Sequence, residues 1–362
     1  MSSILRAKQH QKHPPARVAA WFCTLWSDQL HPLRRHFASP HPEPPLRSSS
    51  RKSVFLSSFS RVTTHPQSWF IITIKMASTR LLEEFLALVP AGHLAEAKET
   101  GAASDAVLAS ITPHDALLVI DMQYDFLPGG AFGVAEGDAT VPTILTWMRR
   151  FADVQATVVC TRDYHPVDHC SFNTHGGPFP PHCVQGSRGS ELIPPIAEAL
   201  RPLIATGNGS VVFKGFSPAV DSFGAAPYDE SRIGTRVTAC AAHRHCGASW
   251  TGAFSLFCSR MAEDCNAPPD VMAVLDRVPL REYLDRRGAT GRIFVVGLAL
   301  DFCVLDSAVN LAVAANGRKL IVVAAGCRAA HIPGVGKHGS GFLSDPAEVC
   351  RQLRQHAVDL LL

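Results

Sequence analysis

Five short apolar runs, rich in valine, leucine and isoleucine, constrain the fold of this chain more than any other feature. They are ALLVID (116–121), ATVVCTR (156–162), SVVFK (210–214), IFVVGL (293–298) and KLIVVAA (319–325). Such runs are typical of strands buried on both faces of a parallel sheet. Segments with helical character lie between or after them, at 139–152, 190–200, 279–287, 303–315 and 346–361. The alternation predicts an α/β fold in three layers, α/β/α and Rossmann-like, with a mainly parallel sheet.

The residues before the first predicted strand divide into two parts. Residues 1–75 hold 11 Lys and Arg against two Asp and Glu, so they carry +9 while residues 76–362 carry −6. No hydrophobic periodicity persists in this basic leader, so we expect it to be disordered, and the mature protein could begin after it, at Met76. Residues 76–112 are expected to form a helical extension, and 113–362 the α/β domain.

Charge and cysteine content exclude several classes of protein. The basic excess is confined to the leader, so the main body has no nucleic-acid footprint. Eleven cysteines without a secretory signal favour a reducing compartment, and the apolar run from Trp69 to Ile74 is too short to span a bilayer. We expect a cytoplasmic protein. Many Arg and Ser with few acids also resemble a mitochondrial transit peptide, should residues 1–75 be translated.

The alternation breaks between about 225 and 272, where no convincing strand is recognised. We interpret this stretch as a surface insertion that interrupts no strand. It contains six residues of metal-ligand type, Cys240, His243, His245, Cys246, Cys258 and Cys265, but their spacing fits no common zinc pattern. A structural zinc site and a loop with free thiols are both open interpretations.

Residues of catalytic type follow four of the predicted strands. Asp121 ends the first, Asp163 and His165 follow the second, Lys214 ends the third, and Cys303 follows the fourth at the start of a helix. The carboxyl ends of parallel strands meet at one edge, so these side chains can share a pocket. A lone cysteine is more often an inert packing residue. Here, however, an ammonium can lower the pKa of the thiol, and a carboxylate can take its proton.

The segment 161–183, TRDYHPVDHCSFNTHGGPFPPHC, is dense in residues that bind metals. Asp163 and His165 project to the same side of an extended backbone, and a later histidine can complete a site. A carboxylate with imidazoles suits zinc, iron or manganese, and open coordination positions are typical of catalysis. A His-rich polar loop that binds no metal is the alternative.

Five motifs occur in one order along the chain. They are VIDMQYDFLPGGAFGV with GD at 137–138, TRDYHPVDHCSF, PFPPHCVQGSRGSEL, FKGFSPAVDSFGA and VVGLALDFCV. Together they resemble the nicotinamidases of the isochorismatase-like cysteine hydrolase family, from about residue 115 to 362 apart from the insertion. The resemblance implies the isochorismatase-like hydrolase fold and the hydrolysis of nicotinamide to nicotinate and ammonia, a step of NAD salvage, through a thioester on Cys303.

The resemblance also implies a role for each matched position. The catalytic triad would be Asp121, Lys214 and Cys303. A divalent metal, zinc first and otherwise iron or manganese, would be held by Asp163, His165 and His182, with His169 as the counterpart of a further histidine in some members. The backbone N–H groups of Ala299 and Cys303 would hold the oxyanion beside a cis Leu298–Ala299 peptide, and nicotinamide would contact Phe126, Phe179 and Leu298.

Four positions depart from the family pattern. Phe179 and Tyr164 stand where tryptophan is usual, Tyr124 where asparagine is usual, and Leu300 where threonine is common. These departures bear on substrate fit and leave the triad and the three metal ligands intact.

Relatives with other chemistry fit the sequence less well. Isochorismatases lack the nucleophilic cysteine, and N-carbamoylsarcosine amidase and ureidoacrylate hydrolase lack the metal cluster. Two alternatives stay open, another small-amide cysteine hydrolase of the same family and a non-catalytic metal-binding interaction protein that uses the insertion. We expect no nucleic-acid or membrane partner; a homo-oligomer and activity on pyrazinamide are left open.

Overall fold

The computed structural model describes residues 80–91, 104–228, 280–314 and 317–362, together with Arg232, Asn266 and the stretches 238–239 and 255–258. The basic leader, residues 1–75, lies outside this described part. The expected helical extension is described in part, as α2 (Arg80–Ala87) and α4 (Ser104–Ala109). Among the described residues, no helix has the length and apolar character needed to cross a membrane.

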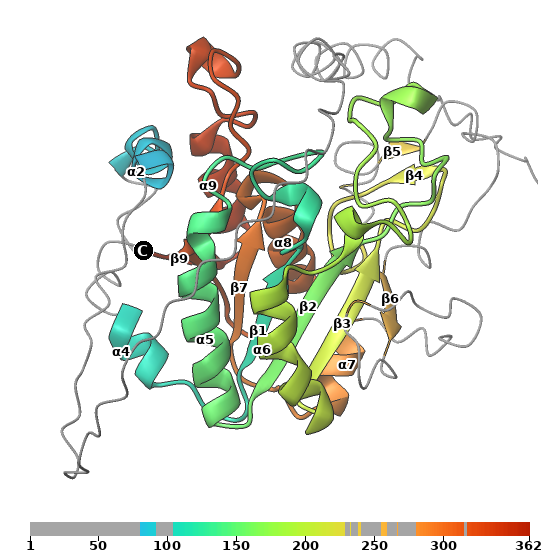
Figure 1. Cartoon of the computed structure of the whole chain (residues 1–362). Helices are drawn as coiled ribbons and strands as arrows, with labels where there is room; N and C mark the ends of the chain where they lie inside the picture. The colour runs from blue at the N-terminus through green and yellow to red at the C-terminus, as the bar shows by residue number, and fades with distance from the viewer. Residues whose placement is uncertain are drawn as a thin grey trace, which may run out of the picture.

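A seven-stranded sheet, ordered β6-β3-β2-β1-β7-β8-β9, forms the centre of the domain (Figure 1). The five predicted strands correspond to β1 (Ala116–Ile120), β2 (Thr157–Asp163), β3 (Gly209–Lys214), β7 (Ile293–Leu298) and β8 (Leu320–Arg328). These five strands pair in parallel with their neighbours among them. Every residue of β1, β2 and β7 is buried, which explains why β1 and β7 are apolar throughout; β2 also buries polar residues, with Arg162 and Asp163 at its carboxyl end.

Both edges of the sheet differ from the expectation. A helix over 346–361 was expected, but α9 (Pro346–Gln355) ends earlier and β9 (Val358–Leu361) pairs in parallel with β8. At the other edge, β6 (Ser255–Cys258) pairs antiparallel with β3, so the expectation that 225–272 contains no strand is wrong. A separate two-stranded sheet joins β4 (Val220–Asp221) to β5 (Thr238–Ala239).

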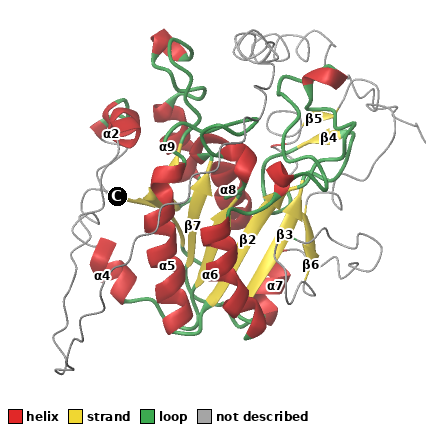
Figure 2. Ribbon diagram, viewed as in Figure 1, coloured by secondary structure: helices red, strands yellow, loops and turns green. Residues whose placement is uncertain are grey.

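Helices cover both faces of the sheet (Figure 2). On one face α5 (Val141–Asp153) and α6 (Pro194–Ala205) lie side by side, and on the other lie α7 (Leu280–Arg286), α8 (Leu305–Ala314) and α9. Helix α5 buries Ile144, Trp147, Met148 and Phe151, which recur at helical spacing and face the sheet. The predicted three-layer α/β/α fold is confirmed.

The order of the strands places a functional site at one edge. From β1 the chain builds outward through β2 to β3, and it later returns to the opposite side of β1 as β7. In open α/β sheets, ligands bind beyond the carboxyl ends of the strands where the order reverses in this way. The carboxyl ends of β1 and β7 are therefore where a site is expected.

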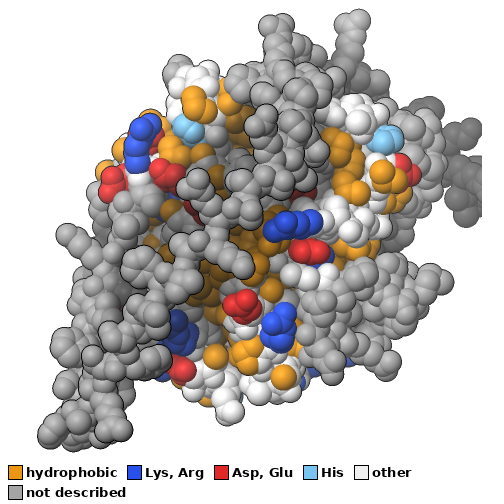
Figure 3. All heavy atoms as spheres, viewed as in Figure 1, with side chains coloured by type: hydrophobic (Ala, Val, Ile, Leu, Met, Phe, Trp, Pro, Cys, Tyr) orange, Lys and Arg blue, Asp and Glu red, His pale blue; other side chains and the backbone are white. Residues whose placement is uncertain are grey.

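Charged side chains on the described surface are mixed in sign. In the face shown in Figure 3, the Lys, Arg, Asp and Glu side chains that are coloured lie scattered and do not gather into a field of one sign. Several form exposed pairs along single helices, such as Arg80 with Glu84 and Arg286 with Glu282. Exposed pairs of this kind contribute about 0.3–0.5 kcal/mol each, so they add little to stability.

Candidate active site

Four polar side chains meet where four neighbouring strands end. Asp121 directly follows β1, Asp163 and Lys214 are the last residues of β2 and β3, and Cys303 lies in the π-helical turn Leu300–Val304 after β7. All four side chains are buried. Because β3, β2, β1 and β7 are consecutive in the sheet, this edge brings together residues from four separate parts of the chain.

Two backbone positions at this edge adopt unusual conformations. Asp121 has φ 47°, in the left-handed region that aspartate tolerates better than most residues. Thr161 of β2 holds it there, since its hydroxyl accepts from the Asp121 N–H at 3.0 Å and donates to Asp121 Oδ1 at 2.6 Å. Gly297 has φ 115°, and a Cβ there would collide with the backbone of Ile120. The glycine therefore lets β7 approach the end of β1.

Lys214 is at the centre of the four side chains. Its Nζ lies 2.8 Å from Asp121 Oδ2, 2.7 Å from Asp163 Oδ1 and 3.4 Å from Cys303 Sγ. Burial alone would lower the pKa of Lys214, but the two carboxylates outweigh burial and hold that pKa well above its usual value. The lysine is therefore a buried ammonium.

The two carboxyl groups beside Lys214 differ in proton affinity. Burial raises the pKa of both; at Asp163 this is outweighed by Lys214 and His165, which bring the pKa far below its usual value. At Asp121 the effect of burial prevails over Lys214, and the charge of Asp163 adds to it, so the pKa is raised. Asp121 is consequently the carboxyl group that accepts a proton more readily.

Cys303 has an acceptor for its proton close by. Burial raises the pKa of its thiol well above the usual value, and Asp121 and Asp163 oppose the lowering by Lys214, so the resting residue is a thiol. Atoms of Asp121, Asp163 and Cys303 lie within 4.8 Å of one another. Within the described residues, Asp121 Oδ2 accepts no hydrogen bond of good geometry, although it lies beside Lys214. That oxygen can take the thiol proton while Lys214 stabilises the thiolate.

A cluster of metal-ligand type adjoins these residues. Atoms of Asp163, His165 and His182 lie within 4.8 Å of one another, and all three residues are buried. His165 Nδ1 donates to the Gly215 carbonyl at 2.9 Å, and His182 Nδ1 donates to the Pro180 carbonyl at 2.8 Å. Because each Nδ1 carries the proton, each Nε2 keeps a lone pair for a metal, an arrangement usual for histidine ligands.

The electrostatics of the cluster also fit a cation. Burial, together with the charge of His165, lowers the pKa of His182 to about 4, so that imidazole is neutral at pH 7. Burial would likewise lower the pKa of His165, but the Asp163 carboxylate raises it above its usual value. The space between Asp163 and His165 thus favours positive charge. One carboxylate and two imidazoles form a donor set that suits zinc, iron or manganese.

His169 does not take part in this cluster. Its ring packs against that of His165, with 4.1 Å between the ring centroids. Its Nε2 donates to the Val220 carbonyl at 3.1 Å, and its Nδ1 accepts from the Ser171 hydroxyl at 2.7 Å. Both nitrogens therefore have other partners, so His169 packs against His165 but does not join the group of close ligand atoms that Asp163, His165 and His182 form.

Gly215 explains how the His165 ring is accommodated. This glycine follows Lys214 with φ 72°, and a Cβ there would collide with the His165 ring. The same residue supplies the carbonyl that fixes the proton on Nδ1. The FKG sequence at 213–215 thus positions both an ammonium and a candidate metal ligand.

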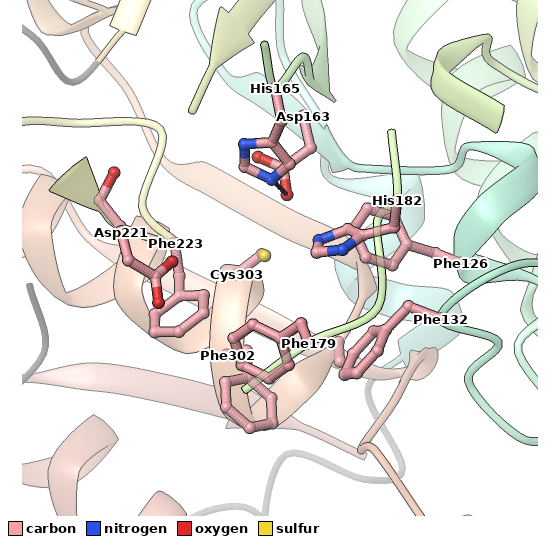
Figure 4. Close-up of a pocket in the computed structure, with 12 residues that line it drawn as sticks. Phe126, Phe132, Asp163, His165, Phe179, His182, Asp221, Phe223, Phe302 and Cys303 are labelled. Atoms are coloured by element: carbon pink, nitrogen blue, oxygen red, sulfur yellow. Dashed lines mark ion pairs between the residues drawn. The ribbon is translucent and has the colours of Figure 1, made fainter. Parts of the chain in front are cut away.

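A pocket lined mainly by aromatic rings opens onto Cys303 and the cluster (Figure 4). About 410 Å³ in and around this pocket, open solvent included, is free of protein atoms. Figure 4 shows the Cys303 sulfur between His182 and Phe126 on one side and Asp221 and Phe223 on the other. Flat apolar walls around a nucleophile suit an aromatic small molecule.

The structure changes the expected lining of this pocket. Phe126, Phe179 and Ala299 lie in it as expected, but Leu298 is buried in the core and does not line it. The peptide bond between Leu298 and Ala299 is cis, as the resemblance implies. The sequence interpretation did not identify five further lining residues, Phe132, Asp221, Ser222, Phe223 and Phe302. Three of them lie in the FKGFSPAVDSFGA motif and one precedes Cys303, so their place within those motifs was the available signal.

The second expected metal site is largely beyond the described part of the chain. Of its six candidate ligands, Cys258 is placed, by its backbone in β6, and the other five lie outside the described residues.

Comparison with known proteins identifies a family to which part of this chain is similar. The model of the isochorismatase domain matches residues 115–205, which include β1, β2 and α6. Residues 115–205 are therefore similar to an isochorismatase domain. The resemblance noted from the five motifs is thereby confirmed, and the matched residues include β1 and β2 of the sheet described above.

Several proteins similar to this chain are nicotinamidases. The nicotinamidase of Escherichia coli is 35% identical over 132 residues, 31% of this chain and 57% of that protein. The nicotinamidase of Acinetobacter baylyi is 28% identical over 239 residues, 62% of this chain and 85% of that protein. The match to the E. coli protein thus spans little more than half of its length. Among solved structures, the zinc complex of a pyrazinamidase from Pyrococcus horikoshii covers 69% of this chain and 99% of its own, with 23% identity and a TM-score of 0.45.

Proposed function

We propose that this protein is a nicotinamidase, which hydrolyses nicotinamide to nicotinate and ammonia. The observation that carries the proposal is the contact of one buried ammonium, Lys214, with Cys303, Asp121 and Asp163 at the base of an aromatic pocket. The nicotinamidases among the relatives support the substrate class. The walls of Phe126 and Phe179 would hold the flat pyridine ring.

The chain's own residues can carry each proton and each charge of the reaction. Asp121 takes the thiol proton, and the Cys303 thiolate attacks the amide carbon while Lys214 stabilises the negative charge. The backbone N–H groups of Ala299 and Cys303 hold the oxyanion, and one such donor is worth about 3–4 kcal/mol in the transition state. Protonated Asp121 then gives its proton to the leaving nitrogen, which departs as ammonia. A water that Asp121 deprotonates hydrolyses the thioester and releases nicotinate.

The donor set Asp163, His165 and His182 would hold one divalent metal, and zinc is our first choice because two imidazoles and a carboxylate suit it. When bound, such a metal supplies a Lewis-acid contact for a nitrogen or oxygen of the substrate. Iron and manganese suit the same donors and are the alternatives.

Ammonia release tests the proposal directly. Purified full-length protein is assayed with nicotinamide, with pyrazinamide, and with benzamide, whose ring lacks the nitrogen. We expect turnover of nicotinamide, its loss after chelation and its recovery on adding metal. No release from nicotinamide by folded, metal-loaded protein, with release from another amide, would point to a different small-amide hydrolase. Release from none of the three would favour the non-catalytic alternative.

A further inference from the structure

The pocket contains one carboxyl group that the proposed reaction does not use. Asp221 lies in β4, is buried, and lines the same pocket as Cys303. Asp163 belongs to the metal-ligand cluster, and Asp121 adjoins the nucleophile from the end of β1. Asp221 belongs to neither group.

The surroundings of Asp221 are apolar on one side and charged on the other. Phe223 and Phe302 line the pocket near it, as Figure 4 shows. Asp221 lines the same pocket as Cys303 and His165, and the charged groups that act on its carboxyl group are His165, Asp163 and Lys214. Within the described part of the chain, none of these charges reaches it through a hydrogen bond.

A buried carboxyl group is costly to ionise, because desolvation disfavours its charged form. Burial raises the pKa of Asp221 to about 6. The group is therefore ionised in most molecules at pH 7 and above, where a carboxylate can only accept hydrogen bonds.

Substrate and product of the proposed reaction differ in charge and in hydrogen-bond donors, and a carboxylate interacts differently with each. The carboxamide of nicotinamide is neutral and has two N–H donors, whereas the carboxylate of nicotinate is negative and has none. Two carboxylates brought together in a pocket with apolar walls repel each other strongly, because little water screens them.

We propose that Asp221 is a specificity-determining residue that favours the neutral carboxamide over the carboxylate product in this pocket. The inference rests on the proposed function. Its carboxylate accepts from the amide N–H of the bound substrate and repels the carboxylate that hydrolysis creates, so it also promotes product release.

Substitution Asp221→Asn tests the inference, since it removes the charge, keeps the shape and adds a donor that a carboxylate can use. Binding of nicotinate to metal-loaded full-length protein is measured by calorimetry in the wild type and the variant. Binding of nicotinamide is measured with both in a Cys303→Ala background. Asp153→Asn, the same change at an exposed residue of α5, is the matched control.

We expect Asp221→Asn to bind nicotinate about tenfold more tightly, with nicotinamide bound as before or more weakly. The ratio of the two affinities should be unchanged in Asp153→Asn. An unchanged ratio in Asp221→Asn overturns the inference. Should that variant fail to fold, Asp221→Ala removes the same charge and is judged by the same ratio. Because neither measurement needs turnover, failure of the inference is distinct from failure of the proposed function, which the ammonia assay decides.

Discussion

Lys214 Nζ lies 2.7 Å from Asp163 Oδ1, so the ammonium that contacts Cys303 also contacts the candidate metal cluster. Asp163 can offer its second oxygen, which lies 3.3 Å from His165 Nε2, toward a metal while the first stays with Lys214. The two parts of the site therefore share one carboxylate. A change in the cluster is expected to alter the charge that acts on Cys303.

Substitution Cys303→Ala should remove the nucleophile and leave the pocket in place. We expect ammonia release from nicotinamide to fall by about 10³-fold or more, because loss of a catalytic nucleophile has effects of at least this size. Binding of nicotinamide should persist, since the aromatic walls are unchanged. A stopped ammonia assay measures the rate of turnover, and calorimetry on the same preparation measures the binding of nicotinamide. Near-wild-type turnover would refute the assignment of Cys303.

Substitution His182→Ala should remove one of three metal ligands and lower the metal content. Metal per chain, measured by plasma mass spectrometry after extensive dialysis, is expected to drop well below that of the wild type. His175→Ala, at an exposed histidine of the same loop region, should keep the full content. His169→Ala should also keep it, because both nitrogens of His169 have other partners. Stoichiometric metal in His182→Ala would exclude it as a ligand.

Substitution Asp115→Asn should destabilise the fold in a pH-dependent way. Asp115 accepts from the Arg292 backbone at 2.7 Å, the Arg292 guanidinium at 2.8 Å and the Thr112 backbone at 2.9 Å, which joins the start of β1 to the start of β7. Burial would raise the pKa of this carboxyl group, but Arg292 outweighs burial and the pKa lies below 3.8. Because the folded-state pKa is the lower one, the stabilisation is present above about pH 4 and is lost as the pH falls through the folded-state value.

We therefore expect Asp115→Asn to lower the free energy of unfolding by about 1–3 kcal/mol at pH 7. The difference from the wild type should shrink below pH 4. Urea titrations at pH 7 and at pH 3 measure it. A difference that is constant over this range would show that the Asp115 charge contributes nothing.

Deletion of residues 228–270 should damage the sheet, although the sequence predicted that the insertion interrupts no strand. The deletion removes β6, which pairs with the edge of β3, and Tyr228, whose hydroxyl contacts the backbone beside the pocket. We expect a melting temperature lowered by several degrees or an insoluble product, because a long strand edge becomes unpaired. Equal melting temperatures for the wild type and the 228–270 deletion would contradict the role of β6.

Substitution Tyr228→Phe should loosen one wall of the pocket. The Tyr228 hydroxyl accepts from the backbone of Phe223 at 3.0 Å and Gly224 at 2.7 Å and donates to Asp306 of α8 at 2.6 Å. Removing it leaves buried groups unsatisfied, so we expect KM for nicotinamide to rise several-fold with a smaller change in kcat. Tyr283→Phe, on α7, is the control. Equal changes in the two variants would indicate a general loss of stability.

The interior of the fold could be predicted from the sequence because burial on both faces leaves apolar runs that few other structures produce. The edges could not. β9 follows α9 with only a short turn, in which Ala357 adopts φ 54° without the glycine that would mark it. β6 is four residues long and antiparallel, so neither its length nor its pattern separates it from a loop.

The candidate site, like the fold, could be predicted from the sequence only in part. The sequence alone predicted that residues at the ends of buried strands lie close together, since the carboxyl ends of parallel strands share one edge of the sheet. The lining residue Asp221 lies in a two-residue strand whose position depends on pairing with β5, which no local pattern encodes. His169 lies in the segment rich in residues of metal-ligand type. The orientation of its ring is nevertheless set by hydrogen bonds to Ser171, which is near in sequence, and to the Val220 carbonyl, which is distant.

The pairing of β7 with β1 joins two parts of the chain that could be produced as separate fragments. Asp121, Asp163 and Lys214 precede the insertion and Cys303 follows it, so a chain cut between 241 and 253 yields two fragments that each lack part of the proposed triad. The pairing of β7 with β1, from Ala116 with Ile293 to Ile120 with Gly297, is what would rejoin them. Such fragments, fused to two proteins that bind each other, would form a split reporter whose ammonia signal appears on association.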